Sequence, residues 1–485
     1  MRSNKIIKVM LTQPNYLWSG GRILKMHPYP LGILNACIKD KFETEIFDPV
    51  FDNLSEKEVS SYLINSNPDV VCISTISTES INQVELMTSL VKRSLPNSII
   101  IVGGVLPTLV LDIAMKDNNV DYWIAGEGEF TLAKLLNELN KDKPNLDLIG
   151  GLAYYDNSQA IINPSKGYIE NLDEIPFADY GNLNFMDYSN RQSKYSLMIP
   201  KQYPYAVTIT ARGCPYKCTF CSGPLYGGKK VRMRSAENVL REIDILYMKG
   251  IREIIFLDDH FLFSKERAVQ IMRGLIERDY NLTWKCCNLA VFRLDEELLD
   301  LMKESKCYQL TVSIESGNEY VLNNIIKKPV IDLKKALEIL DIAKKKGFEI
   351  NANFVIGFPD ETWDQIRDSI NYAEKLNVDL VTFHIATPLP KTELMNMCIE
   401  KGFLLEEDIA NKDKVGYCEG IISTEEFTPI ELQILRAFEW DRINFSSRQR
   451  MEVIGRMMGL TPQEVNDWRK QTRRKLGRFI YKQND

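Results

Sequence analysis

The chain has 485 residues, of which 45% are hydrophobic and 26% charged, and its formal net charge is −6. This length exceeds what one hydrophobic core organises, so we expect two or three domains. The acidic balance gives no basic footprint for nucleic acid, and no apolar run is long enough to cross a membrane. The first residues lack the long apolar segment and cleavage site of a signal peptide, so we expect a cytoplasmic location.

Short apolar runs separated by helical patterns fill residues 1–140. They read KIIKVMLT, TEIFDP, DVVCIST, SIIIVGG and VDYWIAG. Strands that alternate with helices predict an α/β fold with a doubly wound, Rossmann-like parallel sheet. Such a sheet binds its ligand beyond the carboxyl ends of its strands. The loops at those ends are rich in Gly, Ser and Thr, which allows a ligand to approach the backbone closely.

The pattern changes over residues 141–204, which are rich in Pro, Asn and Asp. We interpret them as a linker with a small β-element around GLAYYD. Alternation resumes over residues 205–402, where the apolar runs are YAVTITA, EIIFLDD, TWKCCN, LTVSIES, INANFVIGF and LVTFHIA. Six strands are fewer than the eight of a closed barrel, so we expect an open, partial (βα)6 barrel of the TIM type.

Residues 403–485 have a helical, charged pattern. The segments TPIE and TPQE are both typical of helix starts, with Thr as the cap and Pro at the first helical position. The basic run RKQTRRKLGR is interpreted as a solvated helix face, because the chain as a whole is acidic. These residues predict a small helical C-terminal region.

Three cysteines, Cys214, Cys218 and Cys221, lie within eight residues of the loop after the first barrel strand. Three thiolates at this spacing can hold three irons of a [4Fe–4S] cube and leave the fourth iron free for substrate or cofactor. A tetrahedral zinc ion would need a fourth ligand, and His260 is the one candidate in the next sixty residues. The cysteines in apolar runs, such as Cys72, are expected to be reduced core thiols.

The CxxxCxxC spacing in the first loop of a (βα)6 barrel resembles the radical S-adenosylmethionine (SAM) superfamily. The segments FLDDHF, SIESGNE, NFVIGFPDET and IATPLPKTEL resemble later parts of the same barrel. The resemblance implies that the cluster ligands are Cys214, Cys218 and Cys221. It implies that the residues in contact with SAM are Phe220, Asp258, Ser313, Glu315, Gly357 and Pro359. In the last segment Lys391 replaces the usual Gly, a departure on the substrate side of the pocket.

A doubly wound domain ahead of such a barrel resembles the cobalamin-binding class of this superfamily. GGVLPT, AGEGEFTLAKLL and the linker segment LDEIPFADY carry this resemblance. It implies that the cobalamin-binding residues are Ser74, Thr75, Ile76, Gly103, Gly104 and Glu127. The D-x-H-x-x-G signature is missing, because Lys25 stands two residues before His27. We therefore expect no histidine to ligate cobalt from below, and we expect side chains such as Ile76 at that face.

The resemblance implies methylation of an unactivated carbon of a small-molecule substrate of the natural-product type. One SAM would methylate cobalamin, and a second would give the 5′-deoxyadenosyl radical that lets the substrate take methyl from methylcobalamin. An external electron donor of the flavodoxin or ferredoxin type is expected. The alternative is diol dehydration, cyclisation or rearrangement by a radical SAM enzyme whose N-terminal domain does not use cobalamin chemically. A third hypothesis, a cobalamin- or redox-sensing regulator, would require a DNA- or protein-binding module.

Overall fold

The computed structural model describes residues 5–19, 26–191, 194, 196, 198–328, 331–404 and 420–482, the side chains of Ser19 and 475–482 excepted. The chain divides into two compact units, residues 1–191 and 192–485. The finer boundaries expected after residues 140, 204 and 402 stay predictions. None of the described helices combines the length and apolar character that a membrane span requires.

The first unit contains one seven-stranded sheet, in the order β2-β1-β3-β4-β5-β6-β7. Its strands are β1 (Lys8–Thr12), β2 (Glu43–Phe47), β3 (Val70–Thr75), β4 (Ile99–Gly104), β5 (Tyr122–Ile124), β6 (Leu152–Asp156) and β7 (Gln159–Ile162). The first five pair in parallel, which confirms the predicted doubly wound sheet. The β-element expected around GLAYYD is β6, and it extends the same sheet as an antiparallel hairpin with β7.

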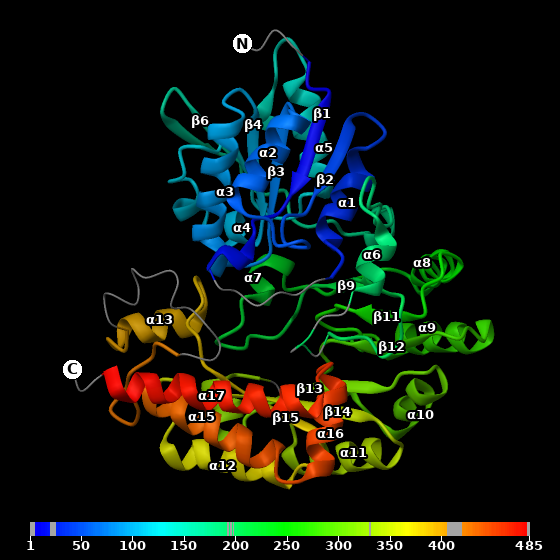
Figure 1. Cartoon of the computed structure of the whole chain (residues 1–485), viewed down its shortest axis with the longest axis vertical. Coiled ribbons are helices and arrows are strands. Elements are labelled where there is room, and N and C mark those ends of the chain that lie inside the picture. Colours follow the sequence, from blue (N-terminus) through cyan, green and yellow to red (C-terminus); the bar gives the residue numbers. More distant parts are fainter. Residues whose placement is uncertain are drawn as a thin grey trace. The chain divides into compact units, whose positions relative to one another are not determined.

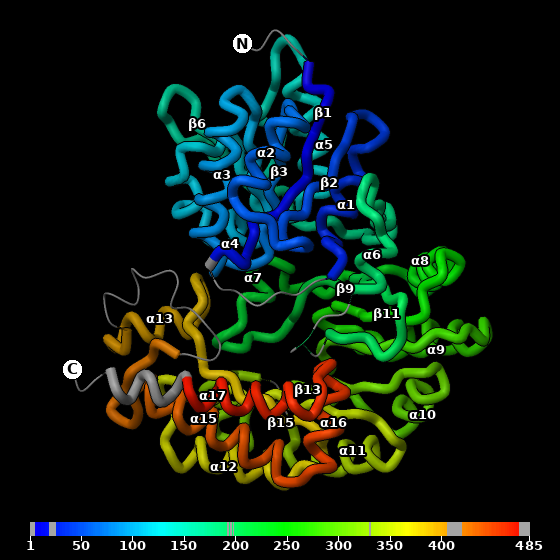
Figure 2. The backbone as a smooth tube through the Cα atoms, in the orientation of Figure 1, coloured from blue at the N-terminus to red at the C-terminus, as the bar shows by residue number. Residues whose placement is uncertain are grey.

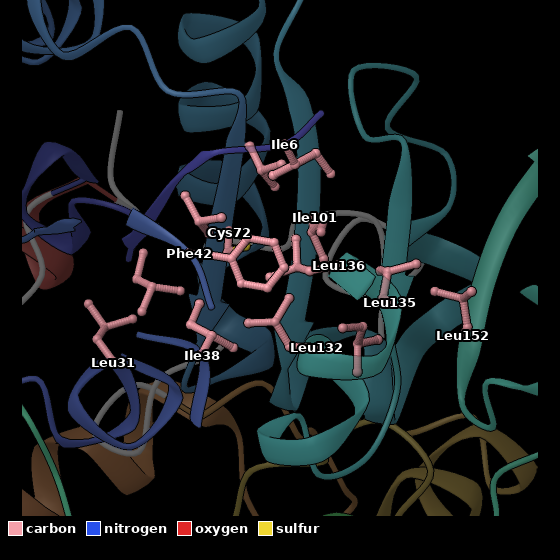
Figure 3. Packing of buried hydrophobic residues seen from close by; sticks show 14 of the residues in the cluster. Ile6, Leu31, Ile38, Phe42, Cys72, Ile101, Leu132, Leu135, Leu136 and Leu152 are labelled. Carbon is pink, nitrogen blue, oxygen red and sulfur yellow. The ribbon is translucent and has the colours of Figure 1, made fainter. Parts of the chain in front are cut away.

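Helices cover both faces of this sheet. They are α1 (Tyr29–Ile38), α2 (Glu56–Ser66), α3 (Ile81–Ser94), α4 (Val105–Ala114), α5 (Glu129–Leu139) and α6 (Phe185–Asn190). On one face, α1 and α5 pack on alternate strand residues, and Figure 3 shows Leu31, Ile38, Leu132 and Leu135 around this core. α2 and α3 lie side by side on the other face (Figure 1). Cys72 lies in the core, 5% exposed, as expected.

The second unit contains the partial barrel. Its strands are β8 (Tyr205–Thr208), β11 (Glu253–Phe256), β12 (Thr283–Cys286), β13 (Gln309–Glu315), β14 (Glu349–Ile356) and β15 (Leu380–Ile385). They form two parallel sheets, β12-β11-β8 and β13-β14-β15, which the isolated bridges Trp284–Cys307 and Leu289–Val312 connect. Among the described strands, β8 pairs with β11 and β15 with β14, so the six strands form the expected open barrel.

The barrel helices begin where the sequence provides a capping side chain. They are α8 (Ala236–Met248), α9 (Lys265–Arg278), α10 (Glu296–Glu304), α11 (Leu333–Lys345) and α12 (Trp363–Lys375), and their caps are Ser235, Ser264, Asp295, Asp332 and Thr362. Each cap accepts a hydrogen bond from the third residue of its helix. These caps fix the points at which the chain leaves the loops at the carboxyl ends of the strands.

The C-terminal helices cover the open edge of the barrel. They are α15 (Pro429–Asn444), α16 (Arg448–Met457) and α17 (Pro462–Lys482), after the short α13 (Glu393–Glu400). Thr428 caps α15 and Thr461 bonds to Glu464 at the start of α17, as TPIE and TPQE predicted. The chain can be followed into these helices beside β15 (Figures 1 and 2). In the basic run, Arg469 pairs with Asp441, and 475–478 lie outside the described side chains.

One side chain of α15 completes the hydrogen bonding of the last strand. Asn444 is fully buried and donates to the carbonyl of Val381 at 2.8 Å, while its own oxygen accepts from the Val381 N–H at 2.7 Å. Arg436 of the same helix donates to the carbonyl of Phe383. An open strand edge exposes unpaired backbone groups, so α15 supplies the partners that a closed barrel would have provided.

Candidate functional site

The three cysteines lie in the loop between the short strand β9 (Ala211–Arg212) and helix α7 (Gly223–Gly227). β9 pairs with β10 (Arg232–Met233), so the chain returns directly beside its own start. Gly213 has φ +91°, and a Cβ there would lie 2.4 Å from the carbonyl oxygen of Lys230. Only glycine fits this close approach, which turns the chain into the cysteine loop.

The middle of the loop is fixed by Thr219, which is 2% exposed. Its N–H donates to the carbonyl of Ile326 and its hydroxyl to the carbonyl of Ile325, both at 3.0 Å. Its carbonyl accepts the N–H of Leu394, in α13. Cys218 and Cys221 flank this anchor on either side, so their positions are set before any ligand binds.

Burial raises the pKa of all three thiols. The pKa of Cys218 rises to about 12 and that of Cys221 to about 11, mainly because they are buried and also because each lies near the other cysteines. The Cys214 pKa is raised for the same first reason. Iron binding must displace these protons, and a metal centre then neutralises thiolates that would otherwise repel each other.

The three thiols suit a cluster better than a single metal ion. They are partly exposed and belong to the described free cysteines. Within the described ranges, no three His, Cys, Asp or Glu side chains converge closely enough to hold one metal ion. The thiolate donor set fits an iron–sulfur cube, whose ligands bind separate irons. His260 lies within the loop's reach, with its Nε2 3.0 Å from the sulfur of Cys214.

A buried ion pair lies beside these thiols. Lys328 Nζ is 2.6 Å from Glu315 Oε1 and also donates to the carbonyl of Ser313 at 3.2 Å. Both charged side chains are 9% exposed. Glu315 has φ +70° at a bulge in the pairing of β13 with β14, which turns the carboxylate toward Lys328. The positive charge of Lys328 opposes the rise in the pKa of Cys214 and Cys218.

The residues predicted near the adenine gather at the end of β14. The ring centre of Phe220 lies 5.8 Å from that of Phe358, the residue that stands between Gly357 and Pro359 in the sequence. Glu361 holds this turn, because its Oε2 accepts the N–H of Gly357 at 2.7 Å and that of Phe358 at 3.1 Å. Burial raises the pKa of Glu361 to about 7, and its second oxygen is buried without a partner in the described structure.

The two adjacent acids after β11 have different surroundings. Asp258 is 1% exposed, and its two oxygens accept from the N–H and the hydroxyl of Thr210, both at 2.5 Å. Asp259 lies close enough to Cys214 and Cys221 to act on their pKa. Burial and the neighbouring Asp258 raise the pKa of Asp259 to about 6. Asp258 therefore braces the strand end, and its predicted contact with the cofactor stays a prediction.

Three further predicted or unusual residues line the same strand ends. Ser313 donates its hydroxyl to Asn288 Oδ1 at 2.8 Å. His384, in β15, is partly exposed, and burial with the charge of Arg436 lowers its pKa to about 4. Lys391, where the resemblance leads us to expect Gly, has φ +62°. A lysine therefore adopts a conformation that favours glycine, which explains why Gly is usual there.

In the first unit, the predicted cobalamin-binding residues meet at the ends of β3 and β4. Ser74 pairs with Gly103 and Thr75 with Gly104 in the strand register. Thr75 donates its hydroxyl to the carbonyl of Gly103 at 2.8 Å. Ile76 follows them and is 56% exposed, so its apolar side chain is accessible at this edge.

One feature of this edge fits a large bound ligand. The phenol oxygen of Tyr16 is buried against the backbone of Ile76, which holds the start of this loop. Gly126 has φ +96°, and a Cβ there would meet nothing within 4 Å, so the space above it is open. Such an open space at the carboxyl ends of the strands fits cobalamin.

Glu127 and His27 have contacts within the first unit. Glu127 Oε2 accepts the N–H of Ile169 at 2.6 Å and so holds the segment that follows the hairpin. His27 is 2% exposed, with its ring 4.6 Å from that of Phe185 and its Nε2 3.0 Å from the Ser189 hydroxyl. Burial lowers its pKa to about 3. The structure thus places His27 in an aromatic core; Lys25 lies outside the described residues.

Lys328, Glu361 and Tyr16 were not among the predicted site residues. Lys328 lies thirteen residues after Glu315, and the five-residue π-turn Val321–Ile325 determines where it returns. The sequence carries one usable signal, the KK pair at 327–328 after an acidic strand end. No comparable signal marks Tyr16, because its position against the backbone of Ile76 follows from tertiary packing.

Comparison with known proteins identifies two families along this chain. Residues 208–373 match the radical SAM superfamily, and residues 23–136 match the B12 binding domain. An uncharacterized methyltransferase of Pyrococcus horikoshii is 31% identical over 405 residues, 83% of this chain and 85% of that protein. The cytidylyl-2-hydroxyethylphosphonate methyltransferase of Streptomyces wedmorensis is 28% identical over 439 residues, which cover 83% of this chain and 80% of that protein.

Solved structures support the same fold. The radical SAM methyltransferase TsrM of Kitasatospora setae, with cobalamin and a [4Fe–4S] cluster bound, has a TM-score of 0.67 at 18% identity and covers 81% of this chain and 78% of its own. The cobalamin-dependent enzyme OxsB has a TM-score of 0.73 at 15% identity and covers 98% and 73%. The cofactors are accordingly a [4Fe–4S] cluster, SAM and cobalamin. The chain belongs to the radical SAM superfamily, in the class of cobalamin-dependent methyltransferases with an N-terminal B12-binding domain.

Proposed function

We propose that this enzyme methylates an unactivated carbon of a small-molecule substrate of the natural-product type. The observation that carries the proposal is the presence, in one chain, of a three-cysteine radical SAM loop and a B12-binding domain. When bound, the cluster, SAM and cobalamin supply radical and methyl chemistry that no protein side chain performs. The methyltransferase names of both relatives above support the same reaction type.

The barrel residues bind and orient the reactants. Cys214, Cys218 and Cys221 hold three irons and leave one open to the amino acid part of SAM. Glu315, fixed by Lys328, is the proposed contact of the amino group, because a buried carboxylate attracts a cation. The remaining SAM contacts proposed are Phe220, Asp258, Ser313, Gly357 and Pro359.

The first unit holds cobalamin at the carboxyl edge of its sheet. The proposed contacts are Ser74, Thr75, Ile76, Gly103, Gly104 and Glu127. Ile76 offers an apolar surface, and the buried phenol of Tyr16 lies against its backbone. With His27 enclosed in an aromatic core, we propose that no histidine of this unit ligates cobalt.

The cluster requires single electrons from outside this chain. We propose a donor of the flavodoxin or ferredoxin type, the small carriers whose low potentials suit such clusters. The cytoplasmic location and the domain boundaries after residues 140, 204 and 402 belong to the same proposal.

Anaerobic reconstitution with iron, sulfide and hydroxocobalamin tests the proposal. We expect about four irons and about one cobalt per chain, the stoichiometry of one cube and one corrinoid. With a reductant and SAM, both 5′-deoxyadenosine and S-adenosylhomocysteine should form. Cys218→Ala should lose 5′-deoxyadenosine but keep cobalt, whereas Cys37→Ala, outside the loop, should keep both.

Either of two results would contradict the proposal. A Cys218→Ala protein that still forms 5′-deoxyadenosine would remove this cysteine from the cluster. A wild-type protein with four irons and no retained cobalt would leave the first unit without cobalamin, and dehydration, cyclisation or rearrangement would become the leading reactions. With a substrate in hand, deuterated-methyl SAM separates the reactions directly, because only methyl transfer adds the labelled methyl mass.

A further inference from the structure

We infer that His260 donates a hydrogen bond to the sulfur of Cys214 and thereby makes the iron–sulfur cluster easier to reduce. The inference rests on the proposed ligation of the cluster by Cys214 and goes beyond it. It gives His260 a positioning and tuning role in place of a ligand role. Hydrogen bonds to cluster sulfurs are one of the means by which proteins set cluster potentials.

The geometry of the contact supports the bond. His260 Nε2 lies 3.0 Å from the Cys214 sulfur, within the range of even an N–H···O hydrogen bond. An iron-bound cysteine has lost its proton. The hydrogen between the two atoms must therefore belong to the imidazole, so Nε2 is the donor and the sulfur is the acceptor.

The surrounding side chains hold the imidazole in this orientation. The Tyr216 ring stands edge-on to His260, with ring centres 5.3 Å apart. Arg293 donates to the Tyr216 hydroxyl at 3.1 Å and, through its other nitrogen, to the carbonyl of Phe263 at 2.9 Å. The Phe263 N–H in turn donates to the carbonyl of His260 at 3.1 Å. Arg293 thus ties both neighbours of the imidazole together.

The three cluster cysteines differ in their hydrogen bonding. Cys221 receives the backbone N–H of Gly223 at 3.3 Å. Among the described residues, Cys214 is the one of the three cysteines whose sulfur has a hydrogen-bond partner on another side chain, His260. The donor comes from β11's loop rather than from the cysteine loop itself, so it can be changed without altering the loop's backbone.

The expected effect follows from where the added electron resides. Reduction by one electron from the external donor places more negative charge on the sulfurs, so a hydrogen bond strengthens on reduction. One such bond shifts the equilibrium for reduction by about tenfold, which is ~59 mV for a one-electron couple. Removing the donor should lower the potential by this amount.

The test uses the reconstituted full-length enzyme. In protein labelled with 15N-histidine, pulsed EPR of the reduced cluster should show a weak 15N coupling that persists in His384→Gln and disappears in His260→Gln. In a redox titration followed by EPR, the equilibrium constant for reduction of the cluster should be about tenfold smaller in His260→Phe than in the wild type. His260→Gln, whose amide nitrogen replaces Nε2, should lie close to the wild type.

Iron counts separate failure of this inference from failure of the proposed function. A wild-type protein without iron would contradict the cluster assignment itself. Four irons in the wild type with no 15N coupling would overturn the inference, and so would an unchanged potential in His260→Phe. The coupling is measured without any substitution at position 260, so the outcome stands even where His260→Phe does not retain its cluster.

Discussion

The buried ion pair beside the cysteine loop can be tested against an exposed pair formed by the preceding residue, Lys327. Lys328 and Glu315 are 9% exposed, with 2.6 Å between Nζ and Oε1. Lys327 pairs with Glu393, and these side chains are 49% and 43% exposed. Lys328→Met leaves a carboxylate buried without its cation, so we expect a loss of about 3–5 kcal/mol in unfolding free energy. Lys327→Met should cost less than ~1 kcal/mol.

Guanidinium unfolding of the metal-free protein, followed by tryptophan fluorescence, measures both losses by linear extrapolation. The double variant Glu315→Gln/Lys328→Met removes both charges and should recover most of the loss, which gives a coupling energy of at least ~2 kcal/mol. Equal stability of the Lys328→Met and Lys327→Met proteins would refute the reasoning. A double variant no more stable than Lys328→Met would refute it as well, because the cost would then arise from packing rather than charge.

Three further outcomes are expected. Burial raises the pKa of Glu361 to about 7, so folding takes up a proton and the free energy of unfolding of the wild type falls as pH rises from about 4.5 to 7. In urea unfolding across this range, the stability of Glu361→Gln relative to the wild type should increase by about 3 kcal/mol. A difference between the two proteins that does not change with pH would contradict this. Gly104→Ala would place Cβ 2.2 Å from the carbonyl oxygen of Thr75 and should unfold the first unit, which circular dichroism would show. The Cβ of Gly126→Ala meets nothing within 4 Å, so this variant should lose only about 1–2 kcal/mol in unfolding free energy. It should nevertheless retain less cobalamin, which cobalt counts would show. Asn444→Ala leaves two buried backbone groups unpaired and should cost about 2–4 kcal/mol in the same unfolding assay; a loss below ~1 kcal/mol would mean that the edge finds other partners.

Most of the parallel strands could be predicted from sequence because they are buried on both faces and read as short continuous apolar runs. VVCIST and NANFVI are examples, and both are strands in the structure. The hairpin β6-β7 was expected in a linker because its residues are half exposed at the sheet edge. Whether such a hairpin joins a sheet depends on a free neighbouring strand, here β5, and local sequence carries no information about that neighbour.

The cysteine loop and the strand-end acid Glu315 could be predicted because spacing and position alone distinguish them. Their environment could not be predicted. Lys328 reaches Glu315 because a π-turn and two residues with positive φ, Glu315 and Lys327, bend the chain back. The contact of His260 with Cys214 depends likewise on the distance between two loops separated by 46 residues. Such pairings follow from tertiary packing, which overrides local preference.

The adjacent acids Asp258 and Asp259 show how a buried acid can control the site through the backbone that leads into the cysteine loop. Position in the sequence does not separate the two acids, because both follow the same strand. In the structure, Asp258 holds the N–H and hydroxyl of Thr210, and Arg267 holds the same hydroxyl and the Thr210 carbonyl. Thr210 lies four residues before Cys214. Asp258 therefore fixes the start of the cysteine loop, while Asp259 lies close enough to Cys214 and Cys221 to raise their pKa.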